Sequence, residues 1–425
     1  MDIIENGSIT SPKGFRASGT TAGIKQSGKP DMALIVSDVP AACAAVFTQN
    51  LVAAAPVQIS RQHVASHGDR MQAIVINSGN ANAVTGRGGL SNAANMTQTA
   101  STELDLESGQ TVVMSTGVIG HQLPMEKVTA GIHQAIAALS YEGGHDAARA
   151  IMTTDTRAKE VAVKLGNVSI GGMCKGAAMI HPNMATMLGV ITTDAKLGRE
   201  PLQAALSAAV AKSFNRISVD GDTSTNDTVF LLANGMSGVT PDAAEFQAAL
   251  DHVCTELAKL IVRDAEGASK FITLKVNGAR TEQEAHQVAS TIATSPLVKT
   301  AIYGRDANWG RVLAAAGRSG VAIEPAKIGL HFGPLEVLRD GTPLPFAEEE
   351  ALKILSETDI DIVLELGQGG ASTTMWTCDL THEYVSLNAD YRTRGSEAAS
   401  WQKAASRRQV ASKSLRRQVL KGEWI

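Results

Sequence analysis

The chain has 425 residues, which is too long for one simple core and predicts two or three packed units. Apolar residues make up 44% and charged residues 19%, as in an ordinary globular protein, and the net charge of −4 gives the whole chain no electrostatic reason to bind nucleic acid. Aromatic residues are scarce at 4%, and no apolar run approaches the ~20 residues that a membrane-spanning helix needs.

The cysteines and the N-terminal segment bear on the cellular compartment. The four cysteines are far apart in the sequence: Cys43, Cys174, Cys254 and Cys378. They form no CxxC pair, which is typical of proteins from reducing compartments. The segment 1–13 lacks the apolar stretch of a secretory signal, and Asp2 and Glu5 argue against a transit peptide. We therefore expect a cytoplasmic protein.

The first half of the chain alternates short strands with helices. Runs rich in β-branched residues predict strands at Met32–Val39, Met71–Asn77 and Thr111–Ser115. Helical periodicity predicts helices at Ser91–Leu104 and Met125–Leu139. The alternating stretch Glu160–Ile170 then meets the glycine pair Gly171–Gly172, and this pattern predicts the arm of a hairpin.

The second half is more helical at first. Apolar residues recur once per turn in four segments: Glu200–Phe214, Ala243–Ala265, Glu282–Thr294 and Phe346–Glu357. Strands are predicted at Phe271–Val276, Lys327–Phe332 and Ile360–Leu366. The order of helices and strands is irregular and shows no internal repeat, so we expect a layered α/β or α+β fold rather than a strict βαβ series.

A Gly- and Ala-rich turn runs into an apolar strand in the middle of the chain. Its sequence is Lys175-Gly176-Ala177-Ala178-Met179-Ile180-His181-Pro182-Asn183-Met184-Ala185-Thr186-Met187-Leu188. From this pattern alone, Thr186 is a core threonine of a strand, Lys175 is a surface lysine, and the Ser115-Thr116-Gly117 segment is a turn that ends a strand.

Several motifs in order give the chain a resemblance to a known family. They are Pro12-Lys13-Gly14-Phe15, Val75-Ile76-Asn77-Ser78-Gly79-Asn80-Ala81-Asn82, Ser115-Thr116-Gly117-Val118-Ile119-Gly120, Met152-Thr153-Thr154-Asp155-Thr156, the central stretch above, Asp222-Thr223-Ser224-Thr225-Asn226-Asp227, Asp306-Ala307-Asn308-Trp309-Gly310 and Asn388-Ala389-Asp390-Tyr391. From about Ser11 to Thr393 the chain resembles the ornithine acetyltransferase family, the bifunctional glutamate N-acetyltransferases and amino-acid acetyltransferases of arginine biosynthesis. The resemblance implies an α/β (layered α+β) fold of the self-processing N-terminal-nucleophile, DmpA-like type.

The resemblance also implies that the precursor cleaves itself between Ala185 and Thr186. A threonine hydroxyl needs a base to act as a nucleophile near pH 7. Cleavage frees the Thr186 α-amine, whose ordinary pKa of about 7.7–8.0 suits that task. One residue then supplies both nucleophile and base, a variant of the catalytic triad.

The remaining implied site residues bind the oxyanion and the amino-acid substrate. By resemblance, the Thr116 hydroxyl and the Gly117 N–H form the oxyanion hole. The implied substrate-binding residues are Thr153, Lys175, Thr186, Glu266, Asn388 and Thr393. Lys175 suits a carboxylate and Glu266 suits an ammonium. The implied reaction is a cofactor-free transfer of acetyl from N2-acetylornithine to glutamate through acetyl-Thr186, with acetyl-CoA an open question as a second donor.

The resemblance divides the chain and predicts its assembly. It implies an α chain of residues 1–185 and a β chain of residues 186–393, intertwined and paired as an α2β2 heterotetramer. Family members normally stop at the position of Thr393, whereas residues 394–425 continue with eight basic and two acidic residues. We expect this basic extension to be disordered, with a partner-binding helix or a vector-derived segment as alternatives.

Other sequence features are weaker candidates. Asp220–Asp227 lacks the Gly and Glu positions of an EF-hand, so a tight structural loop is expected, and the ten histidines show no metal-binding spacing. We expect no metal, no nucleic acid and no membrane partner, and we assign no role to His181. Two alternative functions stay open: an N-terminal-nucleophile aminopeptidase or amidase, and a non-catalytic amino-acid-binding protein.

Overall fold

The structure is a computed structural model and describes residues 1–181 and 187–389. The chain forms two compact units, Met1–Thr381 and a second that begins at His382. The described part of the second unit is helix α11 (His382–Ala389). The predicted cleavage point, with Ala185 and Thr186, and the predicted contact Thr393 lie outside the described residues.

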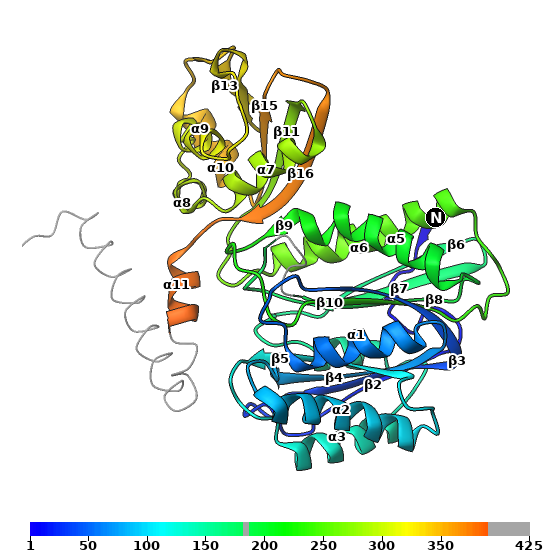
Figure 1. The fold of residues 1–425 in the computed structure, drawn as a ribbon. Coiled ribbons are helices and arrows are strands. Elements are labelled where there is room, and N and C mark those ends of the chain that lie inside the picture. Colours follow the sequence, from blue (N-terminus) through cyan, green and yellow to red (C-terminus); the bar gives the residue numbers. More distant parts are fainter. Residues whose placement is uncertain (182–186, 390–425) are drawn as a thin grey trace, which may run out of the picture. The chain divides into compact units, whose positions relative to one another are not determined.

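A mixed sheet of nine strands forms the larger half of the first unit (Figure 1). Its order is β1 (Asp2–Ile3), β6 (Lys159–Leu165), β7 (Val168–Lys175), β8 (Leu188–Thr193), β10 (Thr228–Ala233), β3 (Met32–Phe47), β4 (Met71–Asn80) and β5 (Thr111–Val118), with β2 (Phe15–Thr20) paired to β3. Most neighbours are antiparallel, but β10 runs parallel to β8 and β5 runs parallel to β4.

The long strand β3 belongs to both halves of this sheet. Its first part pairs with β4 up to Val36, and its second part pairs with β10 from Ala42 to Phe47. The register shifts between Val36 and Ala41, a segment that contains Pro40. Because proline cannot donate to a strand ladder, it is found at such irregularities. The sheet therefore folds over on itself around β3.

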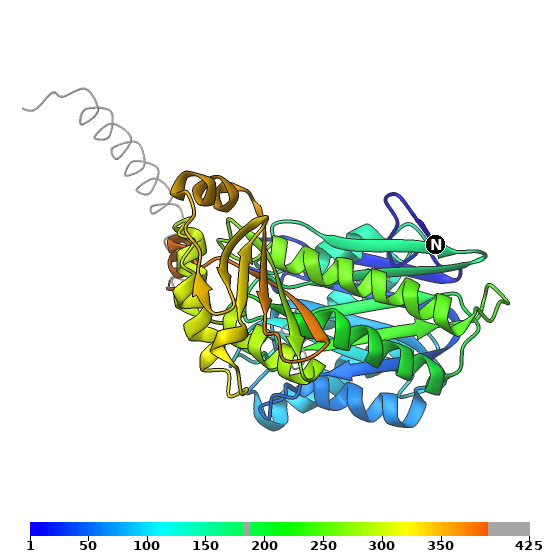
Figure 2. The same ribbon diagram turned by 90° about the horizontal axis from the view of Figure 1, so that it is seen from above.

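The folded sheet gives four layers, helix–sheet–sheet–helix (Figures 1 and 2). Helices α5 (Arg199–Lys212) and α6 (Ala243–Arg263) cover the half made of β6, β7, β8 and β10. Helices α2 (Gly86–Glu103) and α3 (Met125–Ala137) cover the half made of β3, β4 and β5. The inner core between the two sheet layers includes Ile35, Ile74, Met114, Val190 and Phe230.

Two further helices complete this half of the unit. Helix α1 (Ala55–His67) packs against β5 and α2, and helix α4 (Gly144–Ala150) packs against β2 and β3.

Helix α6 shows why the sequence is helical here: Asp242 caps its first turn by accepting hydrogen bonds from the N–H groups of Ala244 and Glu245. Its apolar residues then recur every three or four positions and are buried against β6 and β7.

A smaller sheet with its own apolar core forms the rest of the first unit. Its order is β14 (Thr342–Pro343), β13 (Leu335–Arg339), β12 (Gly329–Phe332), β15 (Asp359–Glu365), β11 (Phe271–Ala279), β16 (Ala371–Cys378) and β9 (Ile217–Ser218). The helices that accompany it are α7 (Glu282–Ala293), α8 (Pro296–Tyr303), α9 (Trp309–Gly317) and α10 (Glu348–Ser356). Residues from β11, β12, β15 and these helices make up the second core.

The layered α/β expectation is confirmed, and the predicted hairpin is present. It consists of β6 and β7, its turn lies at 166–167, and Gly171 and Gly172 are inside β7. Gly171 has no room for a side chain, because a Cβ there would lie 2.2 Å from the carbonyl oxygen of Ser8, while a Cβ on Gly172 would lie 2.8 Å from the end of the Leu257 side chain. The close approach of neighbouring segments, not a turn, explains the pair.

Membrane-spanning helices and metal-binding clusters are both absent from the described residues. Among residues 1–181 and 187–389, no helix has the length and apolar character to cross a membrane, and no group of metal-binding side chains gathers. All four cysteines are buried and free, and burial raises the pKa of Cys43 and Cys174 to about 12.

Candidate active site

The end of β5 carries the two residues predicted to bind the oxyanion. Thr116 is 7% exposed, and Gly117 has a φ of +132°, in the region that favours glycine. A Cβ on Gly117 would lie 2.3 Å from the carbonyl carbon of Gly79 and 2.5 Å from the nitrogen of Asn80. Glycine is thus required at this position by the close approach of the neighbouring strand β4.

Lys175, at the end of β7, reaches the predicted oxyanion threonine. Its ammonium donates to Thr116 Oγ1 over 3.4 Å, and its side chain is buried. Lys175 also lies directly opposite Leu188 in the β7–β8 ladder. Leu188 is the second residue after Thr186 in the sequence. The structure therefore brings the substrate-binding lysine, the oxyanion threonine and the start of the strand that follows the predicted nucleophile into one place.

Several charges set the protonation of Lys175. Burial lowers its pKa below the ordinary lysine value, while Asp155 opposes this shift. Lys159 lowers the pKa further, and Asp227 and Glu266 raise it. An anionic substrate group would add a favourable charge, so binding a carboxylate should favour the ammonium form.

A buried ion cluster supports the loop of Thr153 and the end of β7. Asp155 Oδ2 accepts the N–H of Thr153 over 2.9 Å, and Oδ1 accepts the N–H of Gly176 over 2.7 Å. Lys159 Nζ donates over 2.6 Å both to Asp155 and to Asp264. Burial alone would raise the pKa of Asp155, but Lys175 and Lys159 hold it well below its usual range. The cluster fixes Thr153 relative to Lys175.

Asp264 extends this cluster to the segment of Glu266. Asp264 accepts hydrogen bonds from both the N–H and the hydroxyl of Thr156. Two residues later, the N–H of Glu266 donates to the carbonyl of Ala177 over 2.9 Å. Glu266 is partly exposed and lies near enough to Lys175 to influence its pKa. Thr116, Gly117, Thr153, Lys175 and Glu266 are therefore neighbours.

The other predicted site residues lie in the second unit or outside the described residues. Asn388 is exposed on α11, in the second unit, and donates to the carbonyl of Tyr384 within that helix. Ala185, Thr186 and Thr393 lie outside the described residues. His181, to which the sequence assigns no role, lies 3.3 Å from Ser218 Oγ, and burial lowers its pKa.

Sequence reasoning missed Lys25, a second cation beside the site. Its side chain crosses Gly79, where an added Cβ would lie 2.9 Å from Lys25 Cγ. Its ammonium donates to the carbonyls of Pro30 and Ala150, over 2.5 and 3.4 Å. Burial lowers the pKa of Lys25 to about 8, with Lys175 adding to the shift and Asp31 opposing it. No sequence motif distinguishes this lysine, because its position depends on long-range packing.

The loop before β10 contributes two more residues that sequence reasoning left without a role. Asn226 donates its amide to the carbonyl of Ser115 over 2.8 Å, and Asp227 accepts the N–H of Met187 over 3.0 Å. Both belong to the Asp220–Asp227 segment, which forms a loop as expected. Their place in the sequence, directly before the apolar run of β10, was the available sign.

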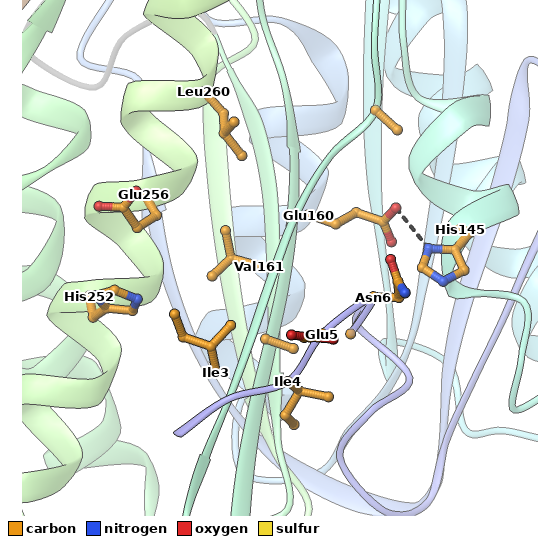
Figure 3. Close-up of a pocket in the computed structure, with 13 residues that line it drawn as sticks. Ile3, Ile4, Glu5, Asn6, His145, Glu160, Val161, His252, Glu256 and Leu260 are labelled. Carbon is orange, nitrogen blue, oxygen red and sulfur yellow. Dashed lines mark hydrogen bonds and ion pairs between the residues drawn. The ribbon is translucent and has the colours of Figure 1, made fainter. Parts of the chain in front are cut away.

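A large cavity lies elsewhere in the first unit. It has a volume of about 560 Å³ and is bounded by β1, β6, α4 and α6 (Figure 3). His145 and Glu160 form an ion pair at one wall, with 2.9 Å between Nδ1 and Oε2. None of the predicted site residues described in the first unit lines it. The candidate site is therefore defined by the convergence of strand ends and not by this cavity.

Known proteins resemble this chain over most of its length. The model of the ArgJ family matches residues 16–393. The arginine biosynthesis bifunctional protein ArgJ of Symbiobacterium thermophilum is 49% identical over 399 residues, covering 91% of this chain and 99% of the relative. The mitochondrial protein of the same name from Heterostelium pallidum is 48% identical over 411 residues, covering 90% of this chain and 94% of the relative.

Two solved structures are also similar in sequence. A chain of the arginine biosynthesis bifunctional protein from Bacillus halodurans is 47% identical and covers 47% of this chain and 97% of its own length, with a TM-score of 0.46. A chain of ornithine acetyltransferase from Mycobacterium tuberculosis, complexed with ornithine, is 38% identical and covers 42% and 97%, with a TM-score of 0.41. The family match and the long relatives confirm the resemblance that the motifs predicted, and the chain belongs to the ArgJ family.

Proposed function

We propose that this chain transfers the acetyl group of N2-acetylornithine to glutamate through an acetyl ester on Thr186, after cleaving itself between Ala185 and Thr186. Its relatives are named bifunctional proteins of arginine biosynthesis, and acyl transfer in that pathway is the activity of the family. The observation that supports this site most is the 3.4 Å contact between Lys175 Nζ and Thr116 Oγ1, next to the strand that follows Thr186.

In the first half-reaction, Thr186 Oγ attacks the acetyl carbon and the Thr186 amine takes the hydroxyl proton. The carbonyl oxygen becomes an oxyanion, which the Thr116 hydroxyl and the Gly117 N–H bind. Because Lys175 donates to Thr116 Oγ1, the hydroxyl proton of Thr116 is left to donate to the oxyanion. The amide C–N bond then breaks, ornithine leaves with the proton, and the acetyl ester remains.

In the second half-reaction, the amine of glutamate attacks the same ester and the Thr186 hydroxyl is restored. An amide is broken and an amide is formed, so the exchange needs neither energy input nor a cofactor. Lys175 binds the substrate carboxylate, and Glu266 binds an ammonium. Thr153, Asn388 and Thr393 supply neutral hydrogen bonds in this proposal. The ester must be kept from water, which requires the site to close over the amino acid.

The finer points of the proposal concern chain division, assembly and compartment. Residues 1–185 form the α chain, residues 186–393 form the β chain, and the fragments pair as an α2β2 heterotetramer. We place the enzyme in the cytoplasm, which the four free cysteines support. The substrates are small amino acids, and neither nucleic acid nor a membrane takes part.

Self-cleavage and the acetyl ester are tested on the same preparation. A denaturing gel of purified protein should show two fragments, and sequencing of the second should begin Thr-Met-Leu. Mixing with N-acetylornithine and quenching in acid should add one acetyl group to that fragment. The Thr186→Ala variant should stay uncut and inactive. An intact, active chain would overturn the mechanism.

Two controls separate the alternatives. Steady release of acetate that glutamate does not accelerate would instead indicate an amidase, and a chain that never cleaves but binds amino acids would indicate a binding protein. Acetyl-CoA with glutamate, compared with N-acetylornithine with glutamate, measures whether the chain also makes N-acetylglutamate from acetyl-CoA. Both assays use the same cleaved enzyme.

A further inference from the structure

Two adjacent side chains connect strand ends that belong to different layers of the fold. Asn226 and Asp227 lie immediately before β10, which is bonded to β8 and β3 but not to β5. The amide of Asn226 nevertheless reaches across the inner core to β5, where it donates to the carbonyl of Ser115 over 2.8 Å. The carboxyl of Asp227 instead accepts the N–H of Met187 over 3.0 Å.

The Asn226 side chain is buried and its polar groups are satisfied. Its second amide bond goes to the carbonyl of Ala81 over 2.6 Å, and its own carbonyl accepts the hydroxyl of Thr225 over 2.6 Å. Ser115 is held from its other side, because its hydroxyl donates to Asn77 Oδ1 over 2.6 Å. A fully satisfied buried network of this kind fixes one arrangement of the chain.

We propose that Asn226 and Asp227 are positioning residues that fix the distance between the nucleophile and the oxyanion hole. Asn226 holds Ser115, which directly precedes Thr116 and Gly117. Asp227 holds Met187, which directly follows Thr186 in the sequence. This inference rests on the proposed function, since it takes Thr186 as the nucleophile and Thr116 and Gly117 as the oxyanion donors.

The carboxyl of Asp227 acts in this proposal as a hydrogen-bond acceptor. It is fully buried, and burial raises its pKa well above the ordinary value, against the opposing effects of the Met187 N–H and of Lys175. Oδ1 accepts from Met187, while Oδ2 is buried and has no hydrogen-bond partner within residues 1–181 and 187–389. Asparagine would keep the acceptor for Met187, so Asp227→Asn is a conservative change.

The expected effect is on the rate of chemistry rather than on substrate binding. A misplacement of reacting groups by about 1 Å can cost on the order of 100-fold in rate. The backbone of Thr153 and of Gly176, next to Lys175, is held by the Asp155–Lys159–Asp264 cluster and not by Asn226. Loss of the Asn226 hydrogen bonds should therefore lower kcat while leaving KM for N-acetylornithine unchanged. Loss of Asp227 should lower kcat too, but it also removes a carboxyl that raises the pKa of Lys175.

The chain offers a matched control at the other end of the same strand. Asn234 immediately follows β10, is similarly buried, and donates its amide to the carbonyl of Lys13 over 2.8 Å. It lies away from the candidate site. Asn234→Ala removes the same kind of hydrogen bond as Asn226→Ala, so it measures the cost of losing a buried amide without disturbing the proposed spacing.

The experiment compares Asn226→Ala, Asp227→Ala, Asp227→Asn and Asn234→Ala in the full chain, by gel, thermal unfolding and acetyl transfer from N-acetylornithine. We expect Asn226→Ala and Asp227→Ala to lower kcat roughly 10- to 100-fold, or to leave a folded, uncut chain. Where Asn226→Ala is cleaved, its KM should stay within about twofold of wild type. Asp227→Asn should keep kcat within about threefold. Asn234→Ala should lower the Tm and keep kcat.

Three other outcomes would contradict the proposal. Equal losses of kcat in Asn234→Ala and Asn226→Ala would overturn the proposal, as would a rise in KM at constant kcat. An Asp227→Asn enzyme as slow as Asp227→Ala would also count against it. If either alanine variant fails to fold, Asp227→Asn and Asn226→Asp test the proposal instead. Asn226→Asp places a carboxyl oxygen against the carbonyl of Ser115, so it must lower kcat. A wild-type enzyme that forms no acetyl-Thr186 would instead reject the proposed function.

Discussion

The ammonium of Lys159 lies 2.6 Å from a carboxylate oxygen of Asp155, and both side chains are fully buried. Lys159 binds Asp264 over the same distance, so one cation joins two anions in the interior. Burial alone would lower the pKa of Lys159, but the two carboxylates raise it above the ordinary value. Removing this cation leaves buried negative charge without compensation, which makes the cluster sensitive to single substitutions.

We predict that Lys159→Met lowers the free energy of unfolding by about 3–5 kcal/mol, the usual cost of removing one partner of a buried ion pair. Lys164→Met, at an exposed lysine of the same strand, should change it by less than about 0.5 kcal/mol. Urea unfolding of both variants in the uncut Thr186→Ala chain measures these free energies, because there the fragments stay covalently joined. Similar small effects for the two variants would show that the cluster does not stabilise the fold.

We predict that Gly117→Ala disrupts the site while Gly120→Ala is tolerated. Both glycines have positive φ values, +132° and +88°, so both substitutions carry backbone strain. An added Cβ at Gly117 would lie 2.3 Å from Gly79, whereas one at Gly120 would meet nothing within 4 Å. Self-cleavage on a gel and the Tm report the difference. Equal tolerance of both variants would contradict the close approach of β4 and β5.

We predict that Thr116→Ala lowers kcat roughly 100- to 1,000-fold, since loss of one oxyanion donor costs about 2.7–4 kcal/mol in the barrier. The ornithine affinity should change little, because this hydroxyl acts when charge develops. Thr116→Ser keeps a hydroxyl and should recover most of the rate. Steady-state kinetics at saturating glutamate provide the measurement, and an unchanged kcat in Thr116→Ala would remove Thr116 from the oxyanion hole.

Lys25 gives the stability a pH dependence in the alkaline range. Its pKa is about 8 in the folded protein, against the ordinary lysine value of 10.5, so above pH 8 the folded state binds fewer protons than the unfolded state. Stability from this group therefore rises with pH between about 8 and 10.5. Lys25→Met should remove that rise, and Lys29→Met, at an exposed position of the same segment, should keep it. Identical pH profiles of Tm for Lys25→Met and wild type would contradict the burial of Lys25.

We predict that residues 394–425 are dispensable for transfer. A chain ending at Thr393 should keep kcat and KM, because the predicted site residues end there. A chain ending at Ala389 retains Asn388 but loses Thr393, so a rise in KM in that chain alone would assign a substrate contact to Thr393. Complete loss of activity in the longer truncated chain would show that the basic extension is required.

The sequence predicted many elements closely and missed others for identifiable reasons. Helix α6 was predicted because Phe246, Leu250 and Val253 recur at helical spacing, and the observed helix ends two residues before the predicted one. Strand β10 was missed because its apolar run directly follows a loop-like motif in the sequence and shows no alternation of apolar and polar residues. Strands buried on both faces lose the period-two pattern that reveals a strand.

The candidate site was predictable only by resemblance. No local pattern indicates that Lys175 touches Thr116, because the two residues are 59 positions apart and lie on strands that are not neighbours in the sheet. Their meeting depends on the fold of the sheet around β3. The same holds for Asp155, Lys159 and Asp264, whose pairing joins a loop, a strand and the end of a helix.

The strand order determines how the two fragments of the mature enzyme can assemble and dissociate. Strands β8 and β10 follow the predicted cleavage point, yet they lie between β7 and β3, which precede it. Each side of this two-strand insert is closed by a ladder of six residue pairs. Before cleavage, these ladders form within one molecule. After cleavage, each denatured fragment must find its partner fragment by diffusion, so the yield of refolded enzyme should depend on protein concentration. Thermal scans of the processed enzyme should therefore show hysteresis that the uncut Thr186→Ala chain lacks.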